Sequence, residues 1–489
     1  MLNRSCVLNA CEQEPLHQSG SIQGHGTLLA LGPNGLVSHV AANVGFFLGG
    51  APSDWLGRTL PSHWVGWLPK RAPGLVRRQA LVGPLEGPQG VLDVVVQGAA
   101  DGAMVLEFTP SKRVAGAAAW AHKELLHDPV TSEHGDQLAR ERLLKAVQKG
   151  TGADRVLFYR FCADGDGEVV TETVSAEEEG RYLGLRFPAS DIPQIARNLY
   201  RLNPWRLISD ARSEPTPLLS GGFAPPDLSR SDLRSVSPVH RVYMGNMGVV
   251  GSLSFPVVVR DSLVALVTAH SRVVLLPQLE TLEQLSAQVQ AYNLAYTAFQ
   301  AQYRMRMVDN LARRFEPVLW TLRRYGDVHA AWPELAPDLM TEFGADGAVV
   351  VSSQGCTVAG QGVEPAALVA LDSWFESGTE VVWLGDNLVR QVPHFPHSET
   401  AGAIALRVVN RAAQAYRVYL TRRQHVHEVS WGGNPHKPVD YHDGVLGIKP
   451  RLSFEKWVEK RMGYALAWRN EDRLLGFKLR DLMQQAVTL

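Results

Sequence analysis

The sequence predicts an α+β protein in which small antiparallel sheets alternate with helices. Two observations carry the prediction: strand–turn–strand segments recur along the chain, and amphipathic helical stretches lie between them. A doubly wound parallel sheet would lack the tight turns. The length of 489 residues corresponds to about three domains at roughly 150 residues each. We therefore expect three related domains, each with a central antiparallel sheet and flanking helices.

The clearest hairpin covers residues 27–40. Its two apolar segments flank Gly32-Pro33-Asn34-Gly35, and the Asn-Gly pair readily adopts the positive φ angles of a tight turn. The same pattern recurs at Asp164-Gly165-Asp166-Gly167, at Arg260-Asp261-Ser262 and at Asp346-Gly347. Each of these turns is expected to join two antiparallel strands.

Apolar spacing predicts a helix over 135–149 and a much longer one over 278–324, which lacks glycine and is interrupted only by Pro317. A helix of that length spans domains or pairs with a second copy. Its expected apolar face consists of Leu279, Leu282, Leu285, Val289, Tyr292, Tyr296 and Phe299. A C-terminal stripe of Leu475, Leu479 and Leu482 predicts a helix cut from a longer protein or used for dimerisation. Residues 431–457, with four glycines and three prolines, predict a long loop-like excursion.

Composition excludes several classes of protein. The 48 Lys and Arg residues nearly balance the 49 Asp and Glu residues, which argues against a general nucleic-acid-binding surface. No apolar run approaches the ~20 residues of a membrane span, and the N-terminus lacks the apolar core of a signal peptide. The four cysteines, at 6, 11, 162 and 356, form no CxxC pair, so a disulfide framework or zinc ribbon is not expected. We expect a cytoplasmic protein without a metal site.

Standard catalytic motifs are missing from the sequence: it has no P-loop, HExxH, GxSxG or EF-hand pattern. We therefore expect no catalytic residues and no enzymatic activity in this chain. Kinase or cyclase activity would need an output domain beyond Leu489.

Three polar clusters remain. Cys11 lies among glutamates that would raise its pKa, which favours an inert thiol in a tail. In the segment 187–193, two prolines surround Ser190-Asp191, so either residue is a candidate N-cap for a helix over 194–202. The alternative is that the rigid turn directs one carboxylate toward a ligand.

The third cluster places histidines and serines on apolar segments of one predicted sheet. His240, Ser252, Ser254 and His270 are its members, and Arg206 and Arg234 lie nearby in the sequence. A lone buried histidine is usually a satisfied core residue. Together with arginines, which grip carboxylates, the group predicts a pocket for an anionic, partly apolar ligand.

Taken together, these segments resemble the bacteriophytochromes, red/far-red photoreceptors that bind biliverdin. The resemblance spans about residues 6–485 in the expected order. It is carried by Cys11-Glu12-Gln13-Glu14-Pro15-Leu16-His17, Ser21-Ile22-Gln23-Gly24-His25-Gly26, Phe187-Pro188-Ala189-Ser190-Asp191-Ile192-Pro193, Ser237-Pro238-Val239-His240, Asn246-Met247-Gly248-Val249, Trp431-Gly432-Gly433-Asn434-Pro435 and Pro450-Arg451-Leu452-Ser453-Phe454. It implies a PAS domain over 1–115, a GAF domain over 116–300 and a PHY domain over 301–489, with a tongue at about 428–460.

The resemblance also implies roles for individual residues. Cys11 would form a thioether with biliverdin IXα, one per chain, with Cys6 as a competitor. Arg206 and Arg234 would hold the propionates, His240 would lie over the pyrrole nitrogens, and His270 would bond the D-ring carbonyl. The chromophore-binding set is Tyr159, Phe187, Asp191, Ile192, Pro193, Tyr200, Arg206, Arg234, Ser237, His240, Tyr243, Ser252, Ser254 and His270. The tongue switch would use Trp431, Pro450, Arg451 and Ser453.

By this resemblance, light isomerises the bond between rings C and D, Asp191 exchanges tongue partners, and the tongue refolds. Expected partners are a second copy, bound through the helical spine, and a downstream output domain or response regulator. Three positions depart from the family pattern: Val239 stands where plant and cyanobacterial relatives attach their bilin, Gly24 replaces a proline, and Leu185 replaces a histidine. Val239 favours attachment at Cys11. The alternative function is a GAF-type small-molecule sensor that binds no bilin.

Overall fold

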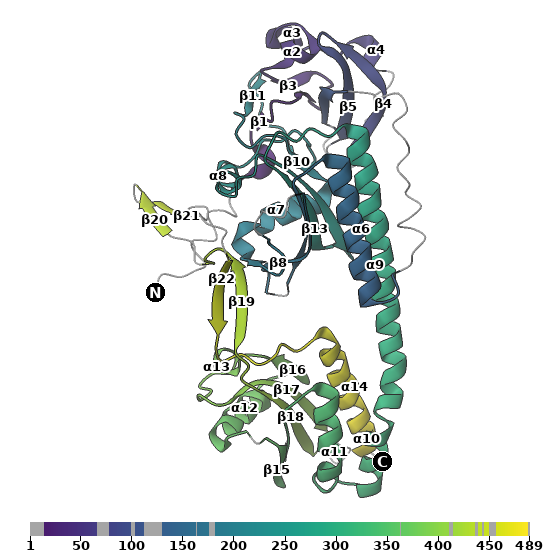
Figure 1. Ribbon diagram of the computed structural model, residues 1–489, viewed down its shortest axis with the longest axis vertical. Coiled ribbons are helices and arrows are strands. Elements are labelled where there is room, and N and C mark those ends of the chain that lie inside the picture. Colours follow the sequence, from purple (N-terminus) through teal and green to yellow (C-terminus); the bar gives the residue numbers. More distant parts are fainter. Residues whose placement is uncertain are drawn as a thin grey trace. The chain divides into compact units, whose positions relative to one another are not determined.

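The chain folds into two compact units in the computed structural model (Figure 1). One comprises Met1–Phe299 with Ser430–Trp457, and the other comprises Gln300–Val429 with Val458–Leu489. The structure describes residues 14–65, 78–98, 103–111, 130–162, 164–175, 181–361, 363–409, 414–435, 439–442, 445–448 and 456–487. Mixed helices and antiparallel sheets confirm the α+β prediction.

The first sheet of the larger unit has seven strands in the order β1-β11-β3-β2-β6-β5-β4. They are β1 (Ser21–Ile22), β2 (Thr27–Leu31), β3 (Val37–Ala41), β4 (Arg78–Gly87), β5 (Gly90–Gly98), β6 (Met104–Pro110) and β11 (Thr216–Ser220). Three short helices accompany this sheet: α2 (Val44–Leu48), α3 (Pro52–Trp55) and α4 (Ser62–Val65). Strand β11 comes from much later in the chain and pairs with both β1 and β3. The N-terminal part is therefore joined to the segment that builds the second sheet.

The second sheet has eight strands in the order β10-β12-β13-β7-β8-β9-β19-β22. They are β7 (Arg155–Phe161), β8 (Gly167–Val174), β9 (Arg186–Phe187), β10 (Arg206–Ile208), β12 (Gly251–Val259), β13 (Ser262–Ser271), β19 (His427–Gly432) and β22 (Lys456–Arg461). A two-stranded ribbon of β20 (Val439–His442) and β21 (Val445–Ile448) lies between β19 and β22 in the sequence.

Helices α6 (Glu133–Thr151) and α9 (Leu279–Arg314) lie side by side over this sheet (Figure 1). Ser132 caps the N-terminus of helix α6, because its side chain accepts a hydrogen bond from the Gly135 amide. Gly152, with a φ of 67°, caps the C-terminus. Tyr292 Oη of α9 donates to Asp136 Oδ1 of α6 at 2.8 Å. The apolar face predicted for the long helix is thus largely buried against its own sheet and needs no second copy to cover it.

The smaller unit has a five-stranded sheet in the order β15-β14-β18-β17-β16. Its strands are β14 (Gly347–Ser352), β15 (Gly355–Gly360), β16 (Val382–Gly385), β17 (Thr400–Val409) and β18 (Ala415–Arg423). Two apolar cores lie on its faces, one with α10 (Glu316–Tyr325), α11 (Val328–Phe343) and α14 (Asn470–Val487), the other with α12 (Pro365–Ser377) and α13 (Leu388–Gln391).

Three of the four predicted hairpins are confirmed. The turn predicted at Asp346-Gly347 is wrong, because these residues lead from helix α11 into β14. Glycine is required there for another reason: a Cβ on Gly347 would lie 2.2 Å from the Gln361 carbonyl oxygen. The turn between β14 and β15 is formed by residues 353–354 instead.

Two predictions about apolar helices need correction. The single helix over 278–324 is wrong, because α9 ends at Arg314 and α10 begins at Glu316, with Phe315 between them at φ −100° and ψ 4°. Pro317 lies in the first turn of α10, where its missing N–H costs no helical bond. The stripe of Leu475, Leu479 and Leu482 packs into the core of the smaller unit, so it requires no dimer partner. The excursion at 431–457 contains β20 and β21 and parts of β19 and β22.

Candidate functional site

A pocket in the larger unit is surrounded by β7, β9, α7 (Gln194–Leu202), β10, α8 (Pro238–Asn246), β12 and β13. Every residue predicted to bind the chromophore lines it, although they are scattered from Tyr159 to His270. Within the described residues, no helix is long and apolar enough to cross a membrane, and no group of His, Cys, Asp or Glu is suited to hold a metal ion.

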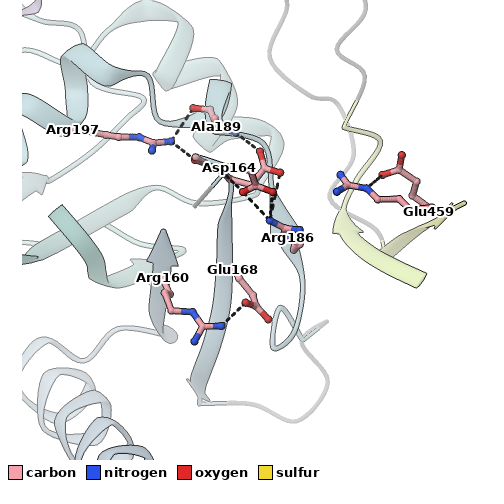
Figure 2. A network of polar contacts seen from close by, with 10 residues as sticks. Arg160, Asp164, Glu168, Arg186, Ala189, Arg197 and Glu459 are labelled. Carbon is pink, nitrogen blue, oxygen red and sulfur yellow. Dashed lines mark hydrogen bonds and ion pairs between the residues drawn. The ribbon is translucent and has the colours of Figure 1, made fainter. Parts of the chain in front are cut away.

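Asp191 lies in a 3-10 turn, Ala189–Asp191, just before α7. The prediction that Ser190 or Asp191 caps α7 is wrong, because the N-cap position is Pro193 and no side chain caps the helix. The turn is instead held from outside, as Figure 2 shows for Arg197 and Ala189. Arg197 donates to the carbonyl oxygens of Gly165, Ala189 and Ile192 at 2.7–3.2 Å. This leaves the Asp191 carboxylate directed to the pocket.

A carboxylate, a phenol and an imidazole meet on one side of the pocket. Tyr243 Oη donates to Asp191 Oδ2 at 3.1 Å, and the His240 ring stacks on the Tyr243 ring with centroids 5.8 Å apart. Tyr243 and His240 lie three residues apart on α8 and therefore share one helical face. The Asp191 charge favours the protonated imidazole, while burial and Arg206 oppose it.

Two arginines, Arg206 and Arg234, also line the pocket. Arg206 donates through Nη2 to the carbonyl oxygens of Arg234 and Ser235, at 2.8 and 3.0 Å. Arg234 is only 7 % exposed, and its Nη1 donates to the Ser229 carbonyl oxygen at 3.2 Å. Burial and the neighbouring Arg206 lower the pKa of Arg234 to about 9. Two cations this close favour an anionic ligand.

His270 on β13 and His25 near the N-terminus are further buried imidazoles. Burial lowers the pKa of His25 and of His240 to about 4 and that of His270 to about 3. His25 Nδ1 lies 2.8 Å from Ser209 Oγ, whereas His270 Nδ1 is buried and has no hydrogen-bond partner among the described residues. His270 also lines the pocket, so its ring is placed to meet a polar group of a ligand.

These depressed pKa values predict a pH dependence of stability in the ligand-free protein. The folded state keeps the imidazoles neutral, while the unfolded state takes up protons below about pH 6.5. The free energy of unfolding is therefore highest above pH 6.5 and falls as the pH drops toward 4. Burial raises the pKa of Glu107 to about 7, so this carboxyl group has the opposite effect and favours the folded state as the pH falls. The measurement is therefore the difference in unfolding free energy between the wild type and His270→Gln across pH 4–8. We expect that difference to change by on the order of 2 kcal/mol, and a constant difference would contradict the prediction.

Aromatic side chains form the remaining wall. Tyr159, Tyr182 and Phe187 lie in contact, with centroids 5.9 Å and 6.0 Å from Phe187. Gly167 makes room for Tyr159, because a Cβ there would lie 1.8 Å from the phenol ring. Next to this wall, Arg186 pairs with Asp164 at 2.7 Å (Figure 2) and lies over the ring of Trp431 on β19.

Three family models match the chain: the PAS fold at residues 11–63, the GAF domain at 137–291 and the phytochrome region at 314–488. Similar curated proteins include a bacteriophytochrome of Pseudomonas aeruginosa, 31% identical over 98% of this chain and 66% of its own length. Cyanobacterial phytochrome B of Nostoc is 29% identical over 97% of this chain and 65% of its own length. The chain belongs to the phytochrome family.

Solved phytochrome structures share this architecture. The wild-type photosensory core module of the Stigmatella aurantiaca phytochrome superposes with a TM-score of 0.82 at 28% identity, covering 97% of each chain. A bacteriophytochrome from R. palustris superposes with a TM-score of 0.81 at 25% identity, over 98% of this chain and 99% of that one. The chain therefore has the fold of a phytochrome photosensory core of PAS, GAF and PHY domains. It spans just under two thirds of the length of the first two curated relatives.

Some residues expected from the phytochrome resemblance lie outside the described residues. These are Cys6, Cys11, Pro450, Arg451 and Ser453. Trp431 is described and is 3 % exposed, and its strand β19 pairs with β9 at Arg186.

Sequence reasoning missed several pocket residues, among them Glu14, Ser231 and Thr268. Ser237 Oγ donates to Glu14 Oε2 at 2.8 Å, which brings the N-terminal segment to the pocket. Thr268 could have been found, because it is two residues before His270 on a strand and so shares its face. Ser231 lies three residues before Arg234, and no periodic pattern in the sequence marks it as a pocket residue.

Proposed function

We propose that this chain is the light-sensing module of a bacteriophytochrome, binding one biliverdin IXα per chain through a thioether to Cys11. The observation that carries the proposal is the pocket itself. It combines two arginines, Arg206 and Arg234, with the His270 imidazole and a wall of aromatic rings. A linear tetrapyrrole with two propionates matches each of these features.

The bilin would supply the conjugated system that absorbs red light and a double bond between rings C and D that isomerises. The protein's residues would hold it in place. Arg234 would grip a propionate bidentately, because its Nε and Nη2 make no hydrogen bond with the described residues. Arg206 already donates to three backbone carbonyls, so it would act by charge and by supporting the Arg234 segment. Tyr200, Ser237, Ser252 and Ser254 would complete the propionate site.

The switch would depend on Asp191. Its backbone carbonyl would face the pyrrole N–H groups beside Ile192 and Pro193, and its carboxylate would meet Arg451 or Ser453 according to the light state. Trp431 and Pro450 would mark the ends of the refolding tongue. His240 would hold and relay a proton, and His270 would bond the D-ring carbonyl next to Tyr159, Phe187 and Tyr243.

At the level of domains, we propose PAS over 1–115, GAF over 116–300 and PHY over 301–489, with the tongue at about 428–460. A homodimer through the helical spine and a downstream output domain or response regulator would carry the signal in the cytoplasm. We assign no enzymatic activity to the chain itself.

The test is an absorbance spectrum of purified protein mixed with biliverdin, recorded before and after red and then far-red illumination. We expect a strong red band that shifts reversibly, and the dark spectrum would identify the resting state. If no new band forms, the proposal fails and the alternative holds, a GAF-type sensor whose carboxylated ligand the two arginines would help to identify.

A further inference from the structure

We infer that Glu107 is a positioning residue for the pocket: it holds the segment 231–234 that presents Arg234 to a ligand carboxylate. Glu107 lies in the seven-stranded first sheet, here called the PAS sheet. The inference rests on the proposed function for the identity of the ligand. The segment's placement can be tested without any ligand.

Glu107 is a carboxylate in the interior of the protein. It lies on β6, opposite Leu28 of β2 and Val95 of β5, and is only 2 % exposed. Isolated carboxylates are rarely buried, because the loss of hydration must be replaced by hydrogen bonds or opposite charges. This one therefore needs a structural reason to be there.

Four hydrogen-bond donors converge on the two oxygens of this carboxylate. Gln97 Nε2 donates to Oε2 at 2.7 Å, from within the PAS sheet. The other three come from the pocket segment: the Asp232 amide at 3.1 Å, the Leu233 amide at 2.9 Å and the Ser231 hydroxyl. An acceptor surrounded only by donors suits the ionised carboxylate.

The same segment is held on its other side through its carbonyl oxygens. The backbone N–H of Gln23 donates to the Leu233 carbonyl oxygen at 2.7 Å. Arg206 Nη2 donates to the Arg234 oxygen at 2.8 Å. Residues 232–234 thus lie between the buried Glu107 anion and the Arg206 cation. The Asp232 and Leu233 N–H groups bond to Glu107, and the Arg234 oxygen accepts from Arg206. This arrangement fixes the backbone from which the Arg234 side chain enters the pocket.

Charge at Glu107 is sensitive to its surroundings. Burial and the neighbouring Asp232 raise its pKa to about 7, while the bonds from Ser231, Asp232 and Leu233 act in the opposite direction. Measurements belong at about pH 8, where Glu107 is largely ionised.

The first test uses pigment-free protein and the variant Glu107→Gln, which keeps the shape but replaces one acceptor with a donor. Exposed Glu86 on β4 supplies the control variant Glu86→Gln. We expect hydrogen exchange at the Asp232 and Leu233 amides to accelerate about tenfold or more in Glu107→Gln alone. Unchanged exchange at both amides would overturn the inference, whether or not biliverdin binds.

The second test separates positioning from general destabilisation. Binding of biliverdin and of its dimethyl ester, which lacks the propionate charges, is titrated in Cys11→Ser protein so that binding is reversible. We expect Glu107→Gln to weaken biliverdin binding about tenfold and ester binding much less. Equal weakening of both ligands would overturn the role at the carboxylate site. Failure of the protein with native Glu107 to bind either ligand would contradict the proposed function, and the inference on ligand binding with it.

If Glu107→Gln does not fold, Gln97→Leu provides a milder variant, because Gln97 contacts the carboxylate from the PAS side and does not line the pocket. The same selective loss is expected at about threefold. No selectivity in Gln97→Leu would count against the inference.

Discussion

Replacing Cys11 by serine is expected to abolish covalent attachment of biliverdin while leaving pigment bound in the pocket. A serine hydroxyl is too weak a nucleophile at neutral pH to replace the thiolate, so no thioether can form. The groups that would hold the pigment, Arg234, His240 and His270, are untouched by the change. Mass spectrometry of the denatured protein, compared with absorbance of the native protein, measures the two effects separately.

Cys6→Ser is the matched control for this prediction, because it removes a thiol from the same segment. Cys6 lacks the Glu-x-Glu-Pro residues that surround the other cysteine. The Cys6→Ser variant should therefore retain full covalent attachment of biliverdin. Covalent pigment in Cys11→Ser, together with its loss in Cys6→Ser, would reverse the assignment of the attachment site.

Much of the pocket could be predicted from the sequence because its residues occur in short motifs with a direct structural meaning. The alternation of Ser252 with Ser254 places both on one face of a strand, and His240 and Tyr243 share a helical face. Motifs of this kind fix local geometry. The resemblance to phytochromes then places separate motifs in one pocket, which periodicity alone cannot do.

Glu107 illustrates what local patterns cannot predict. On its strand it occupies the position of an ordinary polar residue, and three of its four partners are more than a hundred residues away in the sequence. Long-range partners of this kind carry no periodic signal. The errors at Asp346 and at Asp191 have a related cause, since a turn motif and a capping motif each fit the local sequence while neighbouring segments decided the outcome.

Neutralising Asp191 is expected to leave pigment binding intact and to reduce photoconversion about tenfold or more. In Asp191→Asn the backbone carbonyl stays in place, because the turn is held by Arg197 and by the bond from the Ala189 amide to Asp166. Only the side-chain charge is lost. Binding and switching should therefore separate in this variant.

Two consequences of the lost charge lie within the pocket. Tyr243 Oη now donates to Asp191 Oδ2 at 3.1 Å, and the carboxylate favours the protonated form of the stacked His240 ring. An amide still accepts from the phenol but no longer favours the imidazolium, so proton transfer at His240 should become less favourable. His240→Ala should reproduce the defect by removing that group outright.

The measurement is the fraction converted per absorbed red photon, compared with that of Asp261→Asn, which changes an exposed turn aspartate between β12 and β13. This control should photoconvert normally, because Asp261 lies outside the pocket lining. Normal photoconversion in both Asp191→Asn and His240→Ala would show that neither the carboxylate nor the imidazole takes part in switching. The next candidate route would be the aromatic wall of Tyr159 and Phe187, which packs against Gly432 of β19, where a Cβ would lie 2.6 Å from the Phe187 ring.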